Sequence, residues 1–272
     1  PDVDLVSHGT RVVTNAHGLR GPTWEEVRDS GSECVLFLGH SIAFGFGVTS
    51  EEAYPARFAE YEKRGRIGIN LGHCGYRFDQ EFALAHRHLQ EIRPRALVVM
   101  FTPNDLAERY DIFAERFGDE EGGRFERPKR WLRRHSVLYA YLRKSWTRAK
   151  IALGREEPYA APPEENLDAQ SEESLQRFDE YEEALRELQE AADCPLVLSV
   201  FPLRVSEACI VRLRRMATRL GAEWAGFEEV WESDEVYARE ASLGWDTHPS
   251  AATHDFFARE LAAAVERALS EQ

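Results

Sequence analysis

The chain has 272 residues and a formal net charge of −14 at pH 7, with 48 acidic against 34 basic side chains. A hydrophobic content of 43% is ordinary for a globular protein, and the length suffices for one α/β domain with a substantial core. The acidic balance argues against a general nucleic-acid-binding protein, and no run approaches the roughly 20 apolar residues of a transmembrane segment.

Short apolar segments bounded by turn residues alternate along the chain with segments of helical periodicity. This alternation predicts a parallel, doubly wound sheet in a single domain that spans residues 1–272. In such a sheet, functional groups belong at the carboxyl ends of the strands. In chain order we expect a short β element within 1–30, strands at 34–39, 67–71, 96–101, 195–201 and 222–227, and helices near 53–64, 78–93, 173–192, 206–220 and 251–269.

The predicted strand at 34–39 stops at Gly39, and Ser41 follows at the start of a helical pattern. A strand, a sharp turn and a helix are the arrangement in which α/β hydrolytic enzymes expose a nucleophilic hydroxyl. A serine at this place can use backbone N–H groups of the turn and a distant histidine as its base. Ser41 is therefore the candidate nucleophile.

Three later segments carry further polar or turn residues at predicted element ends. Gly75 follows the second strand, Asn104 follows the third, and His248 precedes the last helix. In order and spacing, these segments and the Ser41 segment resemble the four blocks of the SGNH, or GDSL-like, hydrolase family. The resemblance covers residues 32–106 and 194–270.

The resemblance implies a three-layer α/β/α fold around a five-stranded parallel, flavodoxin-like sheet. Ser41 would be the nucleophile and His248 the base, and the oxyanion hole would consist of the N–H groups of Ser41 and Gly75 with the side-chain amide of Asn104. The implied activity is ester hydrolysis, as an esterase or O-deacetylase, through an acyl-Ser41 intermediate and without a metal or organic cofactor. With a second alcohol in place of water, the same site would make an acyltransferase.

Two positions depart from the family pattern. The first block normally reads Gly-Asp-Ser, and His40 stands here in place of the aspartate. His40 either replaces it as a hydrogen-bond acceptor or damages the site, so a catalytically silent binding protein on this fold remains an alternative. The family's acid lies three residues before the histidine, at Trp245; Asp246 is the candidate that would orient His248, with a backbone carbonyl as the alternative.

Residues 107–170 interrupt the alternation and are expected to form a helical insertion. Because this segment begins just past Asn104, we expect it to act as a lid that excludes water and selects the substrate, a small-molecule or carrier-bound acyl ester. Its basic, aromatic part at 124–150 is suited to an acidic partner, or is neutralised within the chain by the acidic stretch at 164–183.

Other polar positions are expected to be structural. Asp105 should brace the turn that it shares with Asn104, and His254 should make a hydrogen bond within the fold. His86 and His88 lie two apart on a predicted helix, hence on different faces, which argues against a metal pair. No signal peptide is recognisable, so the cytoplasm is the expected location, although the chain begins at Pro1 without a methionine.

Overall fold

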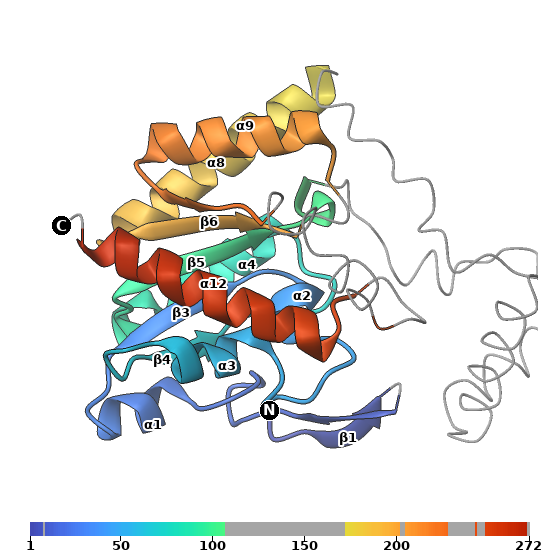
Figure 1. The fold of residues 1–272 in the computed structure, drawn as a ribbon, viewed down its shortest axis with the longest axis vertical. Helices are drawn as coiled ribbons and strands as arrows, with labels where there is room; N and C mark the ends of the chain where they lie inside the picture. Colours follow the sequence, from blue (N-terminus) through green and yellow to red (C-terminus); the bar gives the residue numbers. More distant parts are fainter. Residues whose placement is uncertain (8, 107–171, 202–204, 228–242, 244–247, 271–272) are drawn as a thin grey trace, which may run out of the picture.

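The computed structural model describes residues 1–7, 9–106, 172–201, 205–227, 243 and 248–270. This part of the chain contains a five-stranded parallel sheet with helices on both faces (Figure 1). The spatial strand order is β4-β3-β5-β6-β7, which is the predicted flavodoxin-like order, with its switch point between β3 and β5. The strands are β3 (Cys34–Leu38), β4 (Ile67–Asn70), β5 (Ala96–Phe101), β6 (Leu196–Val200) and β7 (Glu223–Ala225).

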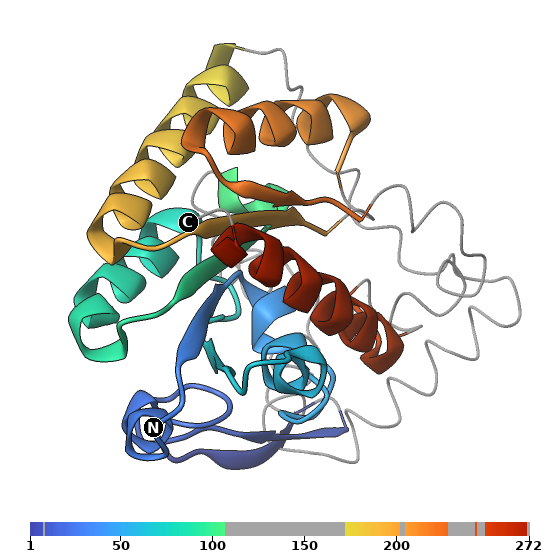
Figure 2. The same cartoon turned by 60° about the vertical axis from the view of Figure 1, so that its left-hand side comes forward.

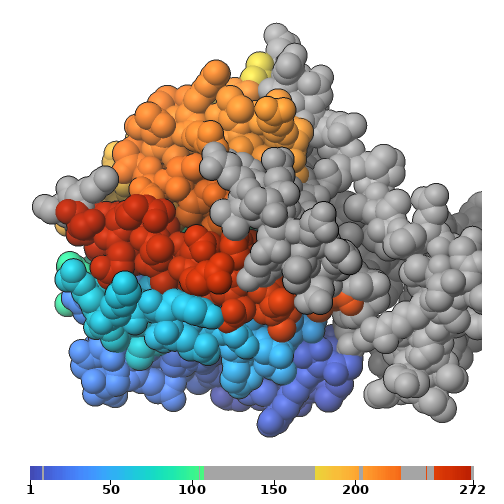
Figure 3. Space-filling view, in the orientation of Figure 1, coloured from blue at the N-terminus to red at the C-terminus, as the bar shows by residue number. Residues whose placement is uncertain are grey.

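Alternation of side chains along the strands builds a separate apolar core on each face of the sheet. Leu36 and Leu38 pack into the core beneath α4 (Phe78–Ile92), α8 (Glu172–Ala192) and α9 (Glu207–Leu220). Val35 and Phe37 point to the opposite core, beneath α3 (Tyr54–Tyr61) and α12 (Ala251–Ser270). The two helix layers are visible on either side of the sheet in Figure 2, and α12 and α3 lie side by side at the surface in Figure 3. The predicted three-layer α/β/α fold is confirmed.

The N-terminal residues form a hairpin and a short helix beside the sheet. Strands β1 (Asp4–Ser7) and β2 (Thr10–Val13) pair antiparallel, which is the β element expected from the sequence. Helix α1 (Trp24–Asp29), which was not expected from the sequence, begins with a capping box between Thr23 and Glu26.

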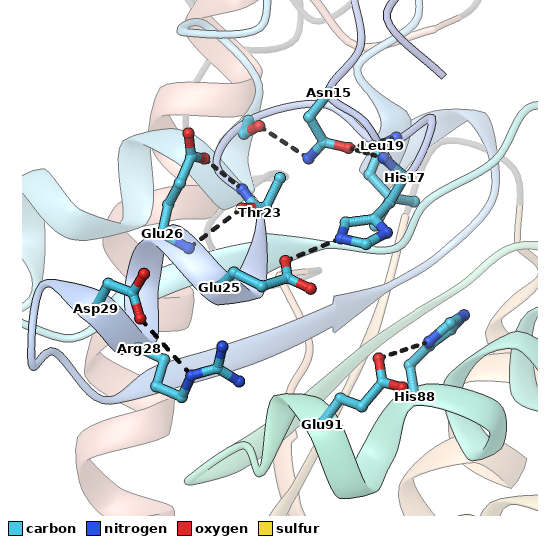
Figure 4. Close-up of polar contacts among 11 residues, drawn as sticks. Asn15, His17, Leu19, Thr23, Glu25, Glu26, Arg28, Asp29, His88 and Glu91 are labelled. Carbon is cyan, nitrogen blue, oxygen red and sulfur yellow. Dashed lines mark hydrogen bonds and ion pairs between the residues drawn. The ribbon is translucent and has the colours of Figure 1, made fainter.

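Contacts between rings join this segment to α4. The buried Trp24 ring stacks on His17, at 3.7 Å between ring centroids, and makes a tilted contact with His88, at 4.8 Å. Each histidine also contacts a glutamate, Glu25 for His17 and Glu91 for His88 (Figure 4). His88 therefore holds the N-terminal segment against α4. Among the described residues, no group of three His, Cys, Asp or Glu side chains is arranged to hold a metal ion.

The predicted insertion at 107–170, with its basic part at 124–150, lies outside the described residues. Within the described part of the chain, no helix is long and apolar enough to cross a membrane.

Candidate active site

The candidate nucleophile lies at the turn between β3 and the single-turn helix α2 (Ser41–Phe44), where Ser41 is the first helical residue. The turn after α2 folds back on this residue, because the N–H groups of Gly45 and Phe46 both donate to the Ser41 carbonyl, at 3.1 and 3.0 Å. The local arrangement is thus the predicted strand, sharp turn and helix. It holds a half-buried hydroxyl at the carboxyl end of β3.

His248, which lies just before α12, meets this serine across 207 positions of sequence. Its Nε2 is 2.6 Å from the Ser41 Oγ, so the hydroxyl donates to the ring in the tautomer that carries its proton on Nδ1. The imidazole also packs against the Phe46 ring, 4.6 Å between centroids. A hydroxyl within hydrogen-bond reach of an imidazole is the arrangement that activates a serine nucleophile.

Gly75 lies in the loop between β4 and α4, in a turn closed by the bond from the Tyr76 N–H to the His73 carbonyl. Its φ of 80° is the left-handed conformation that favours glycine at the third position of such a turn. The loop starts beside the nucleophile helix, because β4 neighbours β3 and the Asn70 side chain donates to the Ala43 carbonyl at 2.8 Å.

The third predicted segment follows β5 directly, as the 3-10 turn η1 (Pro103–Leu106), which contains Asn104. The Asn104 side chain lies outside the described part of the structure, as does Asp246. The Asp105 carboxylate accepts a hydrogen bond from the Thr102 N–H at 2.7 Å, which confirms the expectation that it braces this turn.

A second acidic residue, which was not singled out from the sequence, lies behind the nucleophile turn. Glu81, on α4, accepts a hydrogen bond from the Gly39 N–H, and both Glu81 and Asp105 are only 2% exposed. Burial raises the pKa of Glu81 well above its ordinary value, and the negative charge of Asp105 adds to the effect. Burial likewise raises the pKa of Asp105 to about 7. A signal did exist in the sequence, since Glu81 shares the apolar face of α4 with Ala85 and Leu89.

Two further buried histidines lie near the Ser41–His248 pair in the chain, His40 next to Ser41 and His254 six residues after His248. His40 is buried at the N-cap position of α2, and among the residues that the structure describes its side chain accepts no capping hydrogen bond from the backbone N–H groups of α2. His254 accepts a hydrogen bond on Nδ1 from the Tyr54 N–H at 3.3 Å, which confirms its predicted structural role. Burial lowers the pKa of His254 to about 3, so the ring stays neutral.

A family model for GDSL-like lipases and acylhydrolases matches residues 37–256. A search of curated protein sequences found no match. Similar solved structures include TesA, at 12% identity and TM-score 0.51 over 86% of this chain and 99% of that one. The psychrotrophic esterase EstA from Pseudoalteromonas sp. is similar at 10% identity and TM-score 0.50, over 88% of this chain and 100% of that one. A two-domain esterase active on acetylated mannans is similar at 16% identity and TM-score 0.51, over 93% of this chain and 55% of that one.

The structural similarity to these three proteins shows a shared fold. The family model at residues 37–256 spans most of the chain. The chain therefore belongs to the GDSL-like lipase/acylhydrolase family and is an ester-bond hydrolase.

Proposed function

We propose that the chain hydrolyses carboxylic esters through a covalent acyl group on Ser41, with His248 as the base. The observation that carries this proposal is the 2.6 Å contact between the Ser41 Oγ and the His248 Nε2. As the Oγ attacks the carbonyl carbon, Nε2 takes the serine proton and then gives it to the leaving alcohol when the ester bond breaks. Water then attacks the acyl group, again losing a proton to Nε2, and the carboxylic acid leaves as Ser41 recovers its proton.

The negative oxygen of each tetrahedral intermediate needs donors placed before the reaction starts. Ser41 supplies its own N–H, which lies at a helix start, where backbone donors have no partner inside the helix. The proposal adds the N–H of Gly75 and the side-chain amide of Asn104, which follow the two strands that flank β3. Losing one such donor typically costs about 3–4 kcal/mol of transition-state stabilisation.

The base also needs a partner that fixes its tautomer. We assign this role to Asp246, two residues before His248. A carboxylate on Nδ1 holds the ring in the tautomer that accepts on Nε2 and stabilises the imidazolium that forms.

A series of p-nitrophenyl acyl esters of increasing chain length, combined with a fluorophosphonate that labels active serines, tests the mechanism. We expect the native chain to turn over the esters and take up the label, and Ser41→Ala to do neither, with kcat lower by about 10⁶-fold. The matched control is Ser270→Ala, at the exposed end of α12, which should behave as the native chain.

Two outcomes would contradict the proposal. Turnover that survives Ser41→Ala would exclude the acyl-Ser41 intermediate. A folded native chain that neither turns over esters nor takes up the label would favour the silent binding protein, and His40→Asp would be the first substitution to test.

A further inference from the structure

Arg20 is a buried cation that holds the chain just beyond the nucleophile helix. The residue is 2% exposed, and its guanidinium donates to three carbonyls and one hydroxyl. All four acceptors lie in residues 44–50, which we call the post-nucleophile loop. They are the carbonyls of Phe44 at 3.0 Å, Gly45 at 2.6 Å and Val48 at 2.8 Å, and the Ser50 Oγ at 3.1 Å.

Other parts of the N-terminal segment contact the same loop. The Thr10 hydroxyl, on β2, donates to the Gly47 carbonyl at 2.9 Å. The Ser50 hydroxyl donates to the Val13 carbonyl, on the same strand, at 3.4 Å. The matched family region begins at residue 37, so these contacts come from a part of the chain that the family model does not include.

The post-nucleophile loop is in turn a support for the candidate base. A Cβ atom at Gly47 would overlap the Leu243 side chain, so the absence of a side chain at this position lets the segment before the base approach the loop. The Leu243 N–H donates to the His248 carbonyl at 3.0 Å. From the loop itself, the Phe46 ring packs against the His248 imidazole.

The post-nucleophile loop therefore contacts both members of the Ser41–His248 pair. It continues directly from α2, which carries Ser41, and its residues Phe46 and Gly47 pack against His248 and the segment before it. We propose that Arg20 is a positioning residue, which sets the contact between Ser41 and His248 by fixing the post-nucleophile loop. The proposal rests on the proposed function of that pair. A guanidinium suits this role because its donors lie in one rigid plane, so three carbonyls bound to it are fixed relative to one another.

Arg20 touches neither reacting atom, so its removal should affect geometry rather than substrate binding. A displacement of about 1 Å at a reacting group can lower the rate by about 10²-fold. We expect Arg20→Met to lower kcat by about 10²-fold and to slow fluorophosphonate labelling of Ser41 similarly, with KM changed less than about twofold. Arg20→Lys retains the charge but not the planar set of donors, and kcat should fall about tenfold.

The matched control is Arg11→Met, on the same N-terminal segment. The Arg11 side chain is 67% exposed and pairs only with Asp4 among the described residues, so kcat and labelling should stay native. Circular dichroism and a cooperative unfolding transition establish that each variant is folded. If Arg20→Met does not fold, Arg20→Lys decides the question.

A folded Arg20→Met or Arg20→Lys variant with native kcat and native labelling would overturn the inference. So would a loss in which KM rises while kcat stays unchanged. Ser41→Ala, measured in parallel, separates this failure from that of the proposed function. Turnover that survives Ser41→Ala refutes the mechanism itself, whereas Ser41-dependent turnover that is indifferent to Arg20 refutes only the positioning role.

Discussion

The buried carboxyl of Asp105 should make the native fold less stable as pH rises, and Asp105→Asn should remove this effect. Burial raises the pKa of Asp105 to about 7 from an ordinary value of 3.8. At about 1.4 kcal/mol for each unit of pKa, this difference corresponds to roughly 4 kcal/mol of unfolding free energy. Asparagine has nearly the same shape, and its side-chain oxygen can still accept the hydrogen bond from Thr102.

The direction of the change in unfolding free energy with pH follows from whether the folded or the unfolded chain holds the proton. Below about pH 4 the carboxyl is protonated in both states and its titration has no effect on stability. Between about pH 4 and pH 7 the unfolded chain releases the proton while the folded chain retains it, so the free energy of unfolding falls as pH rises. Above about pH 7 the folded chain carries a buried charge, and the full loss of roughly 4 kcal/mol is reached.

Urea unfolding of the native chain and of Asp105→Asn between pH 4 and pH 8 measures this contribution. The native chain should lose roughly 4 kcal/mol more than the variant over this interval, since any fixed cost of the new amide is the same at every pH. Asp29→Asn, whose side chain is 78% exposed, is the matched control and should follow the native curve. Parallel curves for the native chain and Asp105→Asn would refute the reasoning.

Two further variants test the surroundings of the candidate base. His254, whose pKa burial lowers to about 3, stays neutral in the fold while the unfolded chain takes up a proton, so stability should fall as pH drops from about 6.5. His254→Gln should lose roughly 3 kcal/mol less than the native chain between pH 6.5 and pH 4 in urea unfolding, and an equal loss in both would contradict this account. Gly47→Ala would press a methyl group against Leu243, so we expect a destabilisation of about 1–3 kcal/mol in thermal unfolding and slower labelling of Ser41. Native labelling in this variant would show that the loop does not position the base.

Local signals in the sequence were sufficient to predict the five strands of the parallel sheet in chain order. Each strand is a short apolar run bounded by turn residues. Successive side chains point to opposite faces of the sheet, and both faces are covered by an apolar core, so Phe37 packs into one core and Leu38 into the other. The polar residues at the strand ends were also readable, because a parallel sheet brings those ends to one edge. Ser41 could thus be singled out from its strand, turn and helix pattern, whereas Gly75 and Asn104 were assigned through the resemblance to the family.

The candidate base required both the family pattern and the fold. Nothing local in the sequence joins His248 to Ser41, which lies 207 positions earlier, and only packing of α12 against α3 and the sheet brings the two within 2.6 Å. Glu81 lies between the two cases. Its position on the apolar face of α4 could be predicted from the sequence, whereas its hydrogen bond to the Gly39 N–H could not.

Sequence by itself determined the five strands of the parallel sheet, the helices between them and the nucleophile turn, because these follow from side-chain periodicity and turn chemistry over a few neighbouring residues. Tertiary structure alone decided how that turn is held. Three of the four acceptors of Arg20 are backbone carbonyls, and every residue carries the same carbonyl. The identities of Phe44, Gly45 and Val48 therefore do not indicate that a cation binds their carbonyls, and only the folded chain shows which carbonyls meet around it.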